Sequence, residues 1–342
     1  MKYYIGIDLG DKKNSVCVLD KNGTILIEST FENTPEAFRE FLKPYKNSAV
    51  AIEASTHSLW INKLLVGLGI KVYIANPRKT ALISQNNMKT DKVDARLLAR
   101  LVRSDPELLY PVTTKDMSTQ KDLTLIKSRD SLVKARGDLI RHLRGIIKPF
   151  GLRFPDDVTP DNIHEKGKDI LNNESFPAFK VLLDAIKLLT SKIKILDKQV
   201  ASLIKKKYPE AKNIQTINGV GPITSLTFVL LMGDPKRFKK SRDVGAYLGL
   251  VPRRDQSGEM DKSLHITKTG DNLMRALLVN CSHYILGRFG KDNQLRRHGL
   301  KIMGDGSNKI RKKKAVIAVA RKLAVLMHSM LVSGEEFKNK VA

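Results

Sequence analysis

The stretch Tyr-Tyr-Ile-Gly-Ile-Asp-Leu at residues 3–9 decides how the first part of this chain folds. It is a short run of β-forming residues, and two similar runs follow at 15–19 and 24–30 after tight turns. Consecutive strands that are joined by tight turns predict an antiparallel meander. This meander is the frame on which the rest of the N-terminal region is expected to build.

The elements after the meander predict an α/β fold. The further signals are, in order, a helix start at Thr34-Pro35, a strand at 49–53, a helix at 58–68, a strand at 71–75 and a helix at about 91–103. Three strands followed by helix, strand, helix, strand and helix is the order of a ribonuclease-H-like domain. We therefore predict such a domain, of the RuvC-like type, for residues 1–112.

Two heptad patterns in the middle of the chain predict a pair of long helices. Apolar residues recur every seven positions, as Ile126, Val133, Ile140 and Ile147 and then as Phe179, Ile186, Ile193 and Val200. The Gly- and Pro-containing stretch 150–176 separates them, which predicts an antiparallel coiled-coil arm over 113–210. The first helix also carries cations that fit either a solvated face or a nucleic-acid contact: Lys127, Arg129, Lys134, Arg136, Arg141 and Arg144.

The remaining residues, 211–342, predict a mostly helical domain. The peptide Thr-Ile-Asn-Gly-Val-Gly-Pro-Ile-Thr at 216–224 is similar to the hairpin of a helix-hairpin-helix, in which Gly219 and Gly221 let backbone N–H groups approach a DNA phosphate. A glycine-rich turn that serves packing alone is the alternative. A basic stretch at 309–314 precedes an apolar helix at 315–331, and the tail after Gly334 is expected to be disordered.

The net charge of +26 in 342 residues favours a polyanionic partner. Residues 1–110 hold 16 basic and 12 acidic side chains, whereas 111–342 hold 45 and 23, so the positive charge is concentrated in the second part. No apolar run approaches the ~20 residues needed to span a bilayer, and the N-terminus lacks a signal-peptide pattern. We expect a cytoplasmic nucleic-acid-binding protein that does not enter a membrane. Cys17 and Cys281 are expected to be buried free thiols.

Four carboxylates predict a metal site. Asp8 lies on the opposite face of its strand from Ile7, and Glu53 ends the strand that lies beside the first in a ribonuclease-H-like sheet. Asp91 and Asp94 share one face of a helix that Thr90 caps. Converging acids repel one another unless divalent cations neutralise them, so the pattern indicates Mg²⁺ chemistry on a phosphodiester. Turn capping by Asp8 and favourable helix-dipole contacts of Asp91 and Asp94 are the alternatives.

Ser257 is a further candidate for chemistry, although composition alone does not distinguish it from other serines. It lies beside Gly258 in a segment that is rich in cations, namely Arg253, Arg254, Lys262 and Lys268. Most serines in loops are solvated turn residues. No His/Asp pair is placed to suggest a hydrolase triad.

Together the motifs resemble the DEDD-type insertion-sequence transposases over nearly the whole chain. The matching motifs, in order, are Ile5-Gly-Ile-Asp8, Ala51-Ile-Glu-Ala54, Lys89-Thr-Asp-Lys-Val-Asp-Ala95, Gly219-Val-Gly221, Tyr247-Leu-Gly-Leu-Val-Pro-Arg253, Ser257-Gly258, Thr267-Lys-Thr-Gly-Asp271 and Ala318-Val-Ala-Arg-Lys322. The chain departs from the common pattern at Gln256, where a second serine is frequent, and at Glu259 and Thr269.

The resemblance implies both the site and the reaction. Asp8, Glu53, Asp91 and Asp94 become the metal tetrad, and Ser257 becomes the nucleophile that forms a 5′-phosphoserine link. Arg253 and Arg254, with Lys262 and Lys268, become candidates for holding phosphate. The implied partners are double-stranded donor and target DNA, a bridge RNA, and further copies of the chain in a homodimer or homotetramer.

Three other classes of protein remain as alternatives. A Holliday-junction nuclease would use the tetrad without Ser257. An actin-like ATPase or sugar kinase fits Gly6-Ile-Asp-Leu-Gly10 but needs a late Asp-Gly-Gly loop, which the sequence lacks. An architectural DNA-binding protein would keep the hairpin and need no tetrad.

Overall fold

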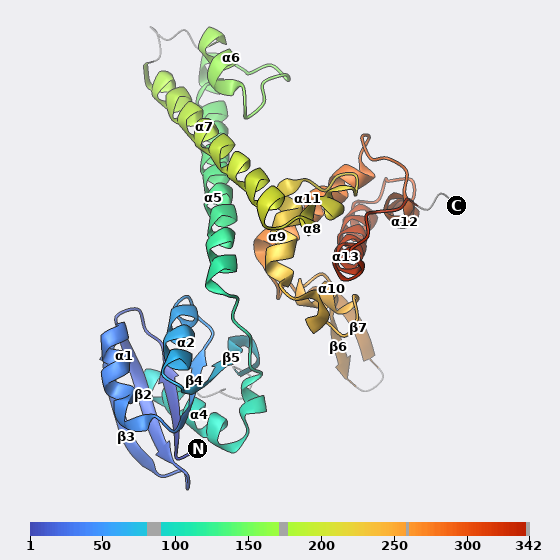
Figure 1. The fold of residues 1–342 in the computed structure, drawn as a ribbon. Helices are drawn as coiled ribbons and strands as arrows, with labels where there is room; N and C mark the ends of the chain where they lie inside the picture. Colours follow the sequence, from blue (N-terminus) through green and yellow to red (C-terminus); the bar gives the residue numbers. More distant parts are fainter. Residues whose placement is uncertain (81–89, 171–176, 258–259, 340–342) are drawn as a thin grey trace. The chain divides into compact units, whose positions relative to one another are not determined.

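The computed structural model describes residues 1–80, 90–170, 177–257 and 260–339. The chain divides into two compact units, Met1–Met117 and Ser118–Ala342, and each unit has its own architecture (Figure 1).

The first unit is an α/β domain. Its elements are β1 (Tyr3–Asp8), β2 (Lys13–Asp20), β3 (Ile25–Glu32), α1 (Pro35–Leu42), η1 (Lys43–Tyr45), β4 (Ser48–Glu53), α2 (Ser58–Gly67), β5 (Lys71–Ala75), α3 (Pro77–Thr80), α4 (Asp91–Ser104) and η2 (Pro106–Leu109). The element order predicted from the sequence is confirmed, and the bounds differ by one or two residues at most ends.

The five strands form one sheet in the order β3-β2-β1-β4-β5. β1, β2 and β3 pair antiparallel, which confirms the meander, whereas β4 and β5 add to β1 in parallel. In the parallel pair Ile7 lies opposite Ile52. The carboxyl ends of β1 and β4 therefore lie side by side at one edge of the sheet.

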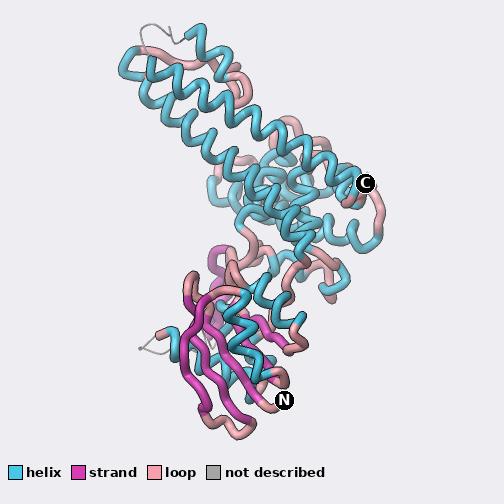
Figure 2. The backbone as a smooth tube through the Cα atoms, turned by 60° about the vertical axis from the view of Figure 1, so that its left-hand side comes forward, coloured by secondary structure: helices cyan, strands magenta, loops and turns pink. Residues whose placement is uncertain are grey.

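Helices cover both faces of this sheet (Figures 1 and 2). Ile5 and Ile7 belong to the cluster that α1 and α2 complete through residues such as Phe38 and Leu65. On the opposite face, small residues such as Ala51 lie beneath α4. Small side chains on this second face let α4 approach the sheet closely.

The second unit is mostly helical. Its elements are α5 (Met117–Ile146), η3 (Lys148–Phe150), α6 (Ile163–Ile170), α7 (Pro177–Lys206), α8 (Glu210–Gln215), α9 (Pro222–Met232), η4 (Pro235–Arg237), α10 (Asp243–Tyr247), β6 (Pro252–Ser257), β7 (Met260–Ile266), α11 (Asn272–Leu286), α12 (Gln294–Met303) and α13 (Lys309–Ser333). The segment around Ser257, for which the sequence analysis predicted no element, forms the antiparallel hairpin β6–β7.

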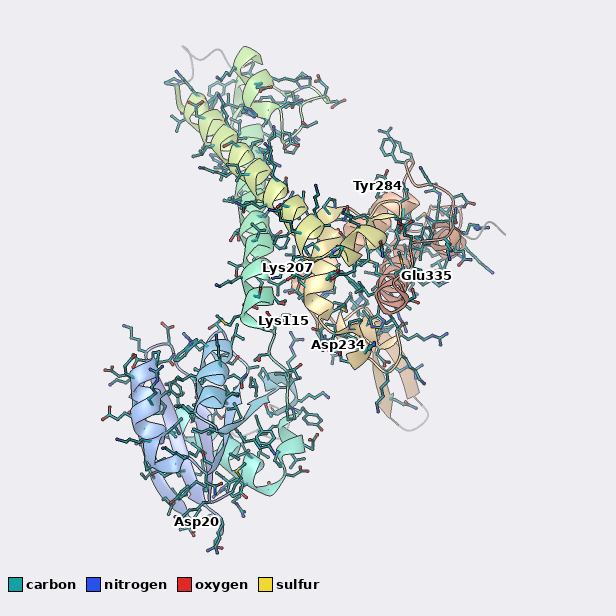
Figure 3. The ribbon with its side chains drawn as sticks, in the orientation of Figure 1. Asp20, Lys115, Lys207, Asp234, Tyr284 and Glu335 are labelled. Carbon is teal, nitrogen blue, oxygen red and sulfur yellow. The ribbon has the colours of Figure 1, made fainter. Side chains whose placement is uncertain are left out.

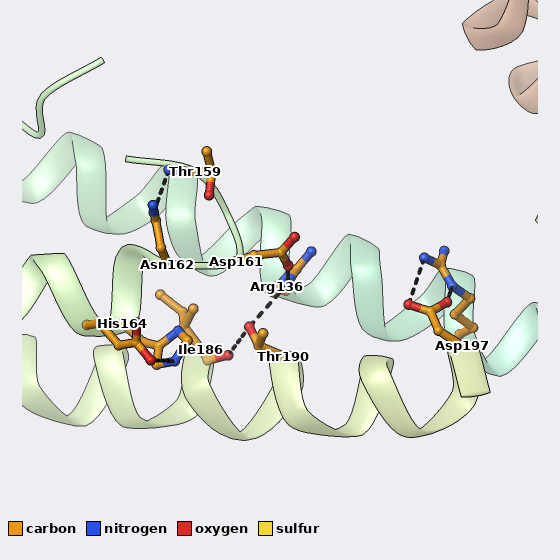
Figure 4. A network of polar contacts seen from close by, with 10 residues as sticks. Arg136, Thr159, Asp161, Asn162, His164, Ile186, Thr190 and Asp197 are labelled. Atoms are coloured by element: carbon orange, nitrogen blue, oxygen red, sulfur yellow. Dashed lines mark hydrogen bonds and ion pairs between the residues drawn. The ribbon is translucent and has the colours of Figure 1, made fainter. Parts of the chain in front are cut away.

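The two long helices α5 and α7 run antiparallel and pack through their apolar residues (Figures 1 and 2). Seven of the eight residues at the predicted seven-residue spacing are buried, and Val133 is partly buried. Two arginines interrupt this apolar seam. Arg129 pairs with Asp197 at 2.5 Å, and the buried Arg136 donates to Asp161 at 2.6 Å and to Thr190 at 3.2 Å (Figure 4).

The C-terminal core is built on α13, which joins the basic stretch and the apolar helix of the sequence into one element. By length and composition α13 could cross a membrane, but half of its apolar window is buried inside the unit. Residues such as Leu323 and Met327 belong to the core cluster that also contains buried residues of α9 and α11. We therefore describe α13 as a core helix.

The prediction of a disordered tail after Gly334 was wrong for its described part. The backbone N–H of Phe337 donates to the hydroxyl of Thr216 at 2.9 Å, and the Asn339 side chain donates to the carbonyl of Asp292 at 2.8 Å. Phe337 also packs against the core of the unit. These contacts join the tail to residues that are distant in the sequence, and they anchor it as far as residue 339.

Candidate active site

The carboxyl edge of the sheet brings two of the predicted acids to neighbouring positions. β1 ends at Asp8 and β4 ends at Glu53, each one residue beyond the paired Ile7 and Ile52. Side chains alternate along a strand, so Asp8 shares the face of Gly6, and Glu53 shares the face of Ala51. Both acids therefore belong to the face of the sheet that α4 covers.

Gly6 explains how α4 reaches that face. A Cβ atom on Gly6 would lie 2.0 Å from the carbonyl oxygen of Ala95 and 2.3 Å from the amide nitrogen of Ala99. Backbone atoms of α4 thus occupy the space where any other residue would place its side chain. This close approach holds the first turn of α4 over the same face of the sheet.

The first turn of α4 carries the other two acids. Thr90 caps the helix, since its hydroxyl accepts from the Val93 N–H at 3.4 Å, as predicted. Asp91 is exposed and Asp94 is partly buried, one turn before and directly before the contact residue Ala95. Among the residues that the structure describes, however, no three His, Cys, Asp or Glu side chains lie close enough to hold a metal ion.

The same edge holds a polar contact that the sequence analysis missed. His57 Nε2 lies 3.3 Å from Asp11 Oδ1, and the Trp60 indole N–H donates to His57 Nδ1 at 3.3 Å. Because Nδ1 accepts from Trp60, Nε2 is the ring nitrogen that can donate to Asp11. The sequence could have indicated that the two residues lie near each other. Asp11 follows Asp8 by three residues and His57 follows Glu53 by four, so both residues come soon after the ends of paired strands.

Two glycine-containing motifs, at 247–253 and 267–271, meet at the base of the β6–β7 hairpin. A Cβ atom on Gly249 would lie 2.4 Å from the Thr269 amide nitrogen, and one on Gly270 would lie 2.3 Å from the Tyr247 carbonyl oxygen. The two segments also hydrogen-bond, because Lys268 N donates to the Gly249 oxygen at 3.1 Å. These glycines permit a tight backbone contact that fixes the hairpin.

Ser257 is the last residue of β6 and pairs with Met260 across the hairpin. Arg253 and Arg254 precede it and are exposed, as is Lys268 beyond β7. Gly258 and Glu259, and the side chains of Ser257 and Lys262, lie outside the described part of the structure.

Gly219 and Gly221 have different surroundings in the turn that joins α8 to α9. Gly219 has a φ of +93°, and a Cβ atom there would lie 2.7 Å from the ring of Tyr284, which Figure 3 labels. This glycine therefore has a packing role. Gly221 faces open space and precedes α9, which begins at Pro222 and has no side-chain cap.

Most of the cations on α5 already have partners within the unit. Arg129 and Arg136 are paired as described above, Arg144 donates to the Val158 carbonyl at 3.1 Å, and Lys134 pairs with Asp130. Arg141 pairs with Asp138. These partners lie within the unit, and the choice between a solvated face and a nucleic-acid contact stays open for this row.

Comparisons with known proteins identify the family. A transposase family model of the IS110 DEDD type matches residues 5–150, and the model described as "Transposase IS116/IS110/IS902 family" matches residues 211–298. The chain is 25% identical to the transposase for insertion sequence element IS1111A of Coxiella burnetii over 98% of this chain and 91% of the relative. It is 26% identical to the IS1328 transposase of Yersinia enterocolitica, over 86% and 90%.

The pilin gene-inverting protein of Moraxella lacunata is 24% identical over 99% of both chains.

The chain belongs to the IS110 family of DEDD transposases. It is therefore a DNA transposase, as the resemblance implied. The DEDD match implies a ribonuclease-H-like fold for the first unit, in agreement with its strand order. The match also suggests a divalent metal.

Proposed function

We propose that this transposase cuts and rejoins DNA strands with Ser257 as the nucleophile and with Mg²⁺ as its metal. The proposed metal-binding residues are Asp8, Glu53, Asp91 and Asp94. The supporting observation is that two of these acids end neighbouring parallel strands and the other two open the helix that covers the same face.

Carboxylate oxygens are the ligands that Mg²⁺ prefers, so the chemistry of these residues fits the metal. Like charges repel, and such acids converge fully only when a cation neutralises them. When bound, the metal supplies positive charge to the phosphate oxygens.

The proposed reaction conserves the phosphodiester bond in the enzyme. The Ser257 hydroxyl gives up its proton as its oxygen attacks the phosphorus, a serine–phosphorus ester forms, and the bond to the DNA 3′ oxygen breaks. The departing strand takes up a proton and leaves as a 3′-hydroxyl. Another 3′-hydroxyl can reverse the step on a different strand without ATP, which is recombination rather than hydrolysis. Arg253 and Arg254, exposed on the strand that carries Ser257, would hold the phosphate, together with Lys262 and Lys268.

The architectural part of the proposal assigns three domains. Residues 1–112 would form the RuvC-like domain, 113–210 a coiled-coil linker, and 211–342 the serine transposase domain. The antiparallel seam of α5 and α7 supports the coiled coil. The open space at Gly221 and the uncapped start of α9 support a helix-hairpin-helix contact with a DNA phosphate, with Gly219 shaping the turn.

The proposed partners are donor and target DNA duplexes and a bridge RNA that selects them. The scarcity of aromatic residues, 6%, supports a protein that binds duplexes through charge and leaves sequence choice to base pairing. We further propose that the chain acts as a homodimer or homotetramer in the cytoplasm, at the nucleoid. RNA-free protein should then bind DNAs of equal length without preference at about 150 mM salt. Site-specific recombination without RNA would contradict the proposed bridge RNA but not the serine chemistry.

The decisive experiment tests the nucleophile. Ser257→Ala should bind a nicked duplex normally and form no covalent protein–DNA adduct, whereas the matched control Ser263→Ala should form the adduct. Asp94→Asn should lose Mg²⁺-dependent cleavage while its circular dichroism stays unchanged. An adduct from Ser257→Ala would reassign the nucleophile. Cleavage by that variant that leaves free ends would favour a Holliday-junction type of nuclease.

A further inference from the structure

The start of α13 carries a dense group of cations. Five of its first six residues are basic, and all five are exposed: Lys309, Arg311, Lys312, Lys313 and Lys314. Asn308 caps the helix, and its side chain accepts from the N–H groups of Ile310 at 2.8 Å and Arg311 at 3.2 Å. The first turn contains no acidic residue.

This placement works against the helix itself. The N-terminal end of a helix carries a partial positive charge and favours acidic side chains, so a group of cations there is electrostatically unfavourable. In the described part of the chain, Lys309, Lys312, Lys313 and Lys314 have no ion-pair partner that would offset this cost. Helix formation therefore does not explain the cations, whereas a polyanionic partner does.

The neighbouring helix extends the positive surface. α12 packs on α13 where a Cβ atom on Gly299 would lie 2.5 Å from a methyl group of Val319, and it carries the exposed Lys301. Burial, together with the charges of Lys322 and Lys301, lowers the pKa of His298. The lysine charges add to the effect of burial, so the positive charge of this surface reaches His298.

The one acid in residues 298–322 does little to neutralise this surface. Asp305 lies in the turn between α12 and α13 and accepts from the backbone and the hydroxyl of Ser307. These bonds, with a smaller contribution from the charge of Arg311, hold the pKa of Asp305 below its usual range. Its single charge stands against six exposed cations.

We propose that this α12–α13 surface, formed by Lys301, Lys309 and 311–314, binds the phosphate backbone of duplex DNA. It deepens the proposed function by assigning DNA retention to a surface apart from Ser257. Residues 294–322 contain no Phe, Tyr or Trp, so the surface offers no base-stacking platform for a single strand. Exposed lysines instead suit contacts to phosphates, which position a duplex without selecting its sequence.

The experiment compares two charge-matched triple variants of the full chain. The test variant is Lys309→Gln with Lys312→Gln and Lys313→Gln, which spares Arg311 because that side chain donates to the Ile302 carbonyl. The control is Lys187→Gln with Lys194→Gln and Lys198→Gln, three exposed lysines of α7. The readouts are affinity for a 30-base-pair DNA duplex as a function of salt, and the urea midpoint of unfolding.

The test variant should bind DNA at least about tenfold more weakly near 100 mM salt, and its salt slope should be shallower by about 2 to 3, since each phosphate contact contributes about 0.9. Its urea midpoint should stay the same or rise, because cations leave the positive end of a helix. The control should change DNA affinity much less. Equal losses in both variants would overturn the proposal, as would a larger loss for duplex or single-stranded RNA than for DNA.

A separate readout keeps this inference distinct from the proposed chemistry. At protein concentrations that saturate a nicked duplex, the test variant should still form the Ser257 adduct, because its nucleophile is intact. Loss of the adduct only in Ser257→Ala, together with loss of affinity only in the test variant, would support both proposals. An unchanged affinity in the test variant would overturn this one and leave the serine chemistry untouched.

Discussion

In the first unit Asp8 and Glu53 end strands that form a buried sheet, whereas in the second unit Ser257 ends a strand whose described residues are exposed. The acids are therefore positioned by the packing of a core, and the serine by a hairpin whose base is held by backbone contacts at Gly249 and Gly270. Changes in packing should affect the first site through folding. Changes on the hairpin should affect the second site without any loss of stability.

The largest effect is expected from Gly6→Ala, which tests the dependence of the first unit on packing. The new methyl group would overlap backbone atoms of Ala95 and Ala99, and backbone cannot move aside as a flexible side chain can. We expect a loss of about 3 kcal/mol in the free energy of unfolding, at the upper end of overpacking costs. Urea denaturation followed by circular dichroism measures it.

The matched variant in the second unit is Leu264→Ala. Leu264 lies on β7 and is 45% exposed, so we expect a change within about 0.5 kcal/mol. Equal stability of Gly6→Ala and the wild type would contradict the close approach of α4 to β1. A large loss for Leu264→Ala would show that the hairpin is part of the core.

A middle-sized effect is expected at the arm, where a polar contact replaces apolar packing. Arg136→Ala removes a buried guanidinium and its bonds to Asp161 and Thr190, but the Asp161 side chain is 69% exposed and stays hydrated. We therefore expect a loss of about 2 kcal/mol, below the 3–5 kcal/mol typical when a buried charge is left unpaired. Arg136→Met should be closer to neutral, because it keeps the volume of the side chain.

The outcome separates two roles for Arg136. If Arg136→Met were as destabilising as Arg136→Ala, the hydrogen bonds would dominate over packing in holding the segment 151–162, which carries Asp161, to α5 and α7. If neither variant lost stability, the network in Figure 4 would have no role in the arm.

The first unit was predictable from its sequence because local signals and tertiary packing agree there. Alternation placed Asp8 opposite Ile7, and Thr90 marked the start of α4. The hairpin around Ser257 was missed because its cations and Gly258 resemble a loop, and its strands are set by distant backbone contacts at Gly249 and Gly270. No local pattern reports such contacts.

The side-chain partners at the candidate sites could not be predicted from the sequence for the same reason. The sequence marked the arm cations but not their partners, since Arg136 finds Asp161 only after the chain reverses. It also marked Asp8 and Glu53 but not the contact between Asp11 and His57, which needs the parallel pairing of β1 with β4. Residue types were predictable, whereas side-chain partners depended on the fold.

A small effect is expected from the Asp11–His57 contact, which lies at the edge of the packed unit. Asp11 is 92% exposed, so the contact is open to solvent. A double-mutant cycle with Asp11→Asn and His57→Ala should give a coupling below about 1 kcal/mol, as for exposed ion pairs. A coupling above about 2 kcal/mol would show that this edge is as tightly organised as the core beneath it.

The smallest perturbation uses the two native thiols to follow each unit separately, because Cys17 lies in the first unit and Cys281 in the second, and both are buried. Burial, reinforced by the charge of Glu28, raises the pKa of Cys17 to about 11, and burial also raises the pKa of Cys281. A thiol reacts as its thiolate, which forms in quantity only as the pH approaches the pKa, so at pH 8 neither should react with a thiol reagent in the native protein.

Cys17→Ser and Cys281→Ser leave one reporter each, and labelling in rising urea should give one transition per unit. Adding Gly6→Ala to each should move the Cys17 transition to lower urea and leave the Cys281 transition in place. Equal shifts of both transitions would mean that the two units unfold together and that the contrast between them ends at their sites.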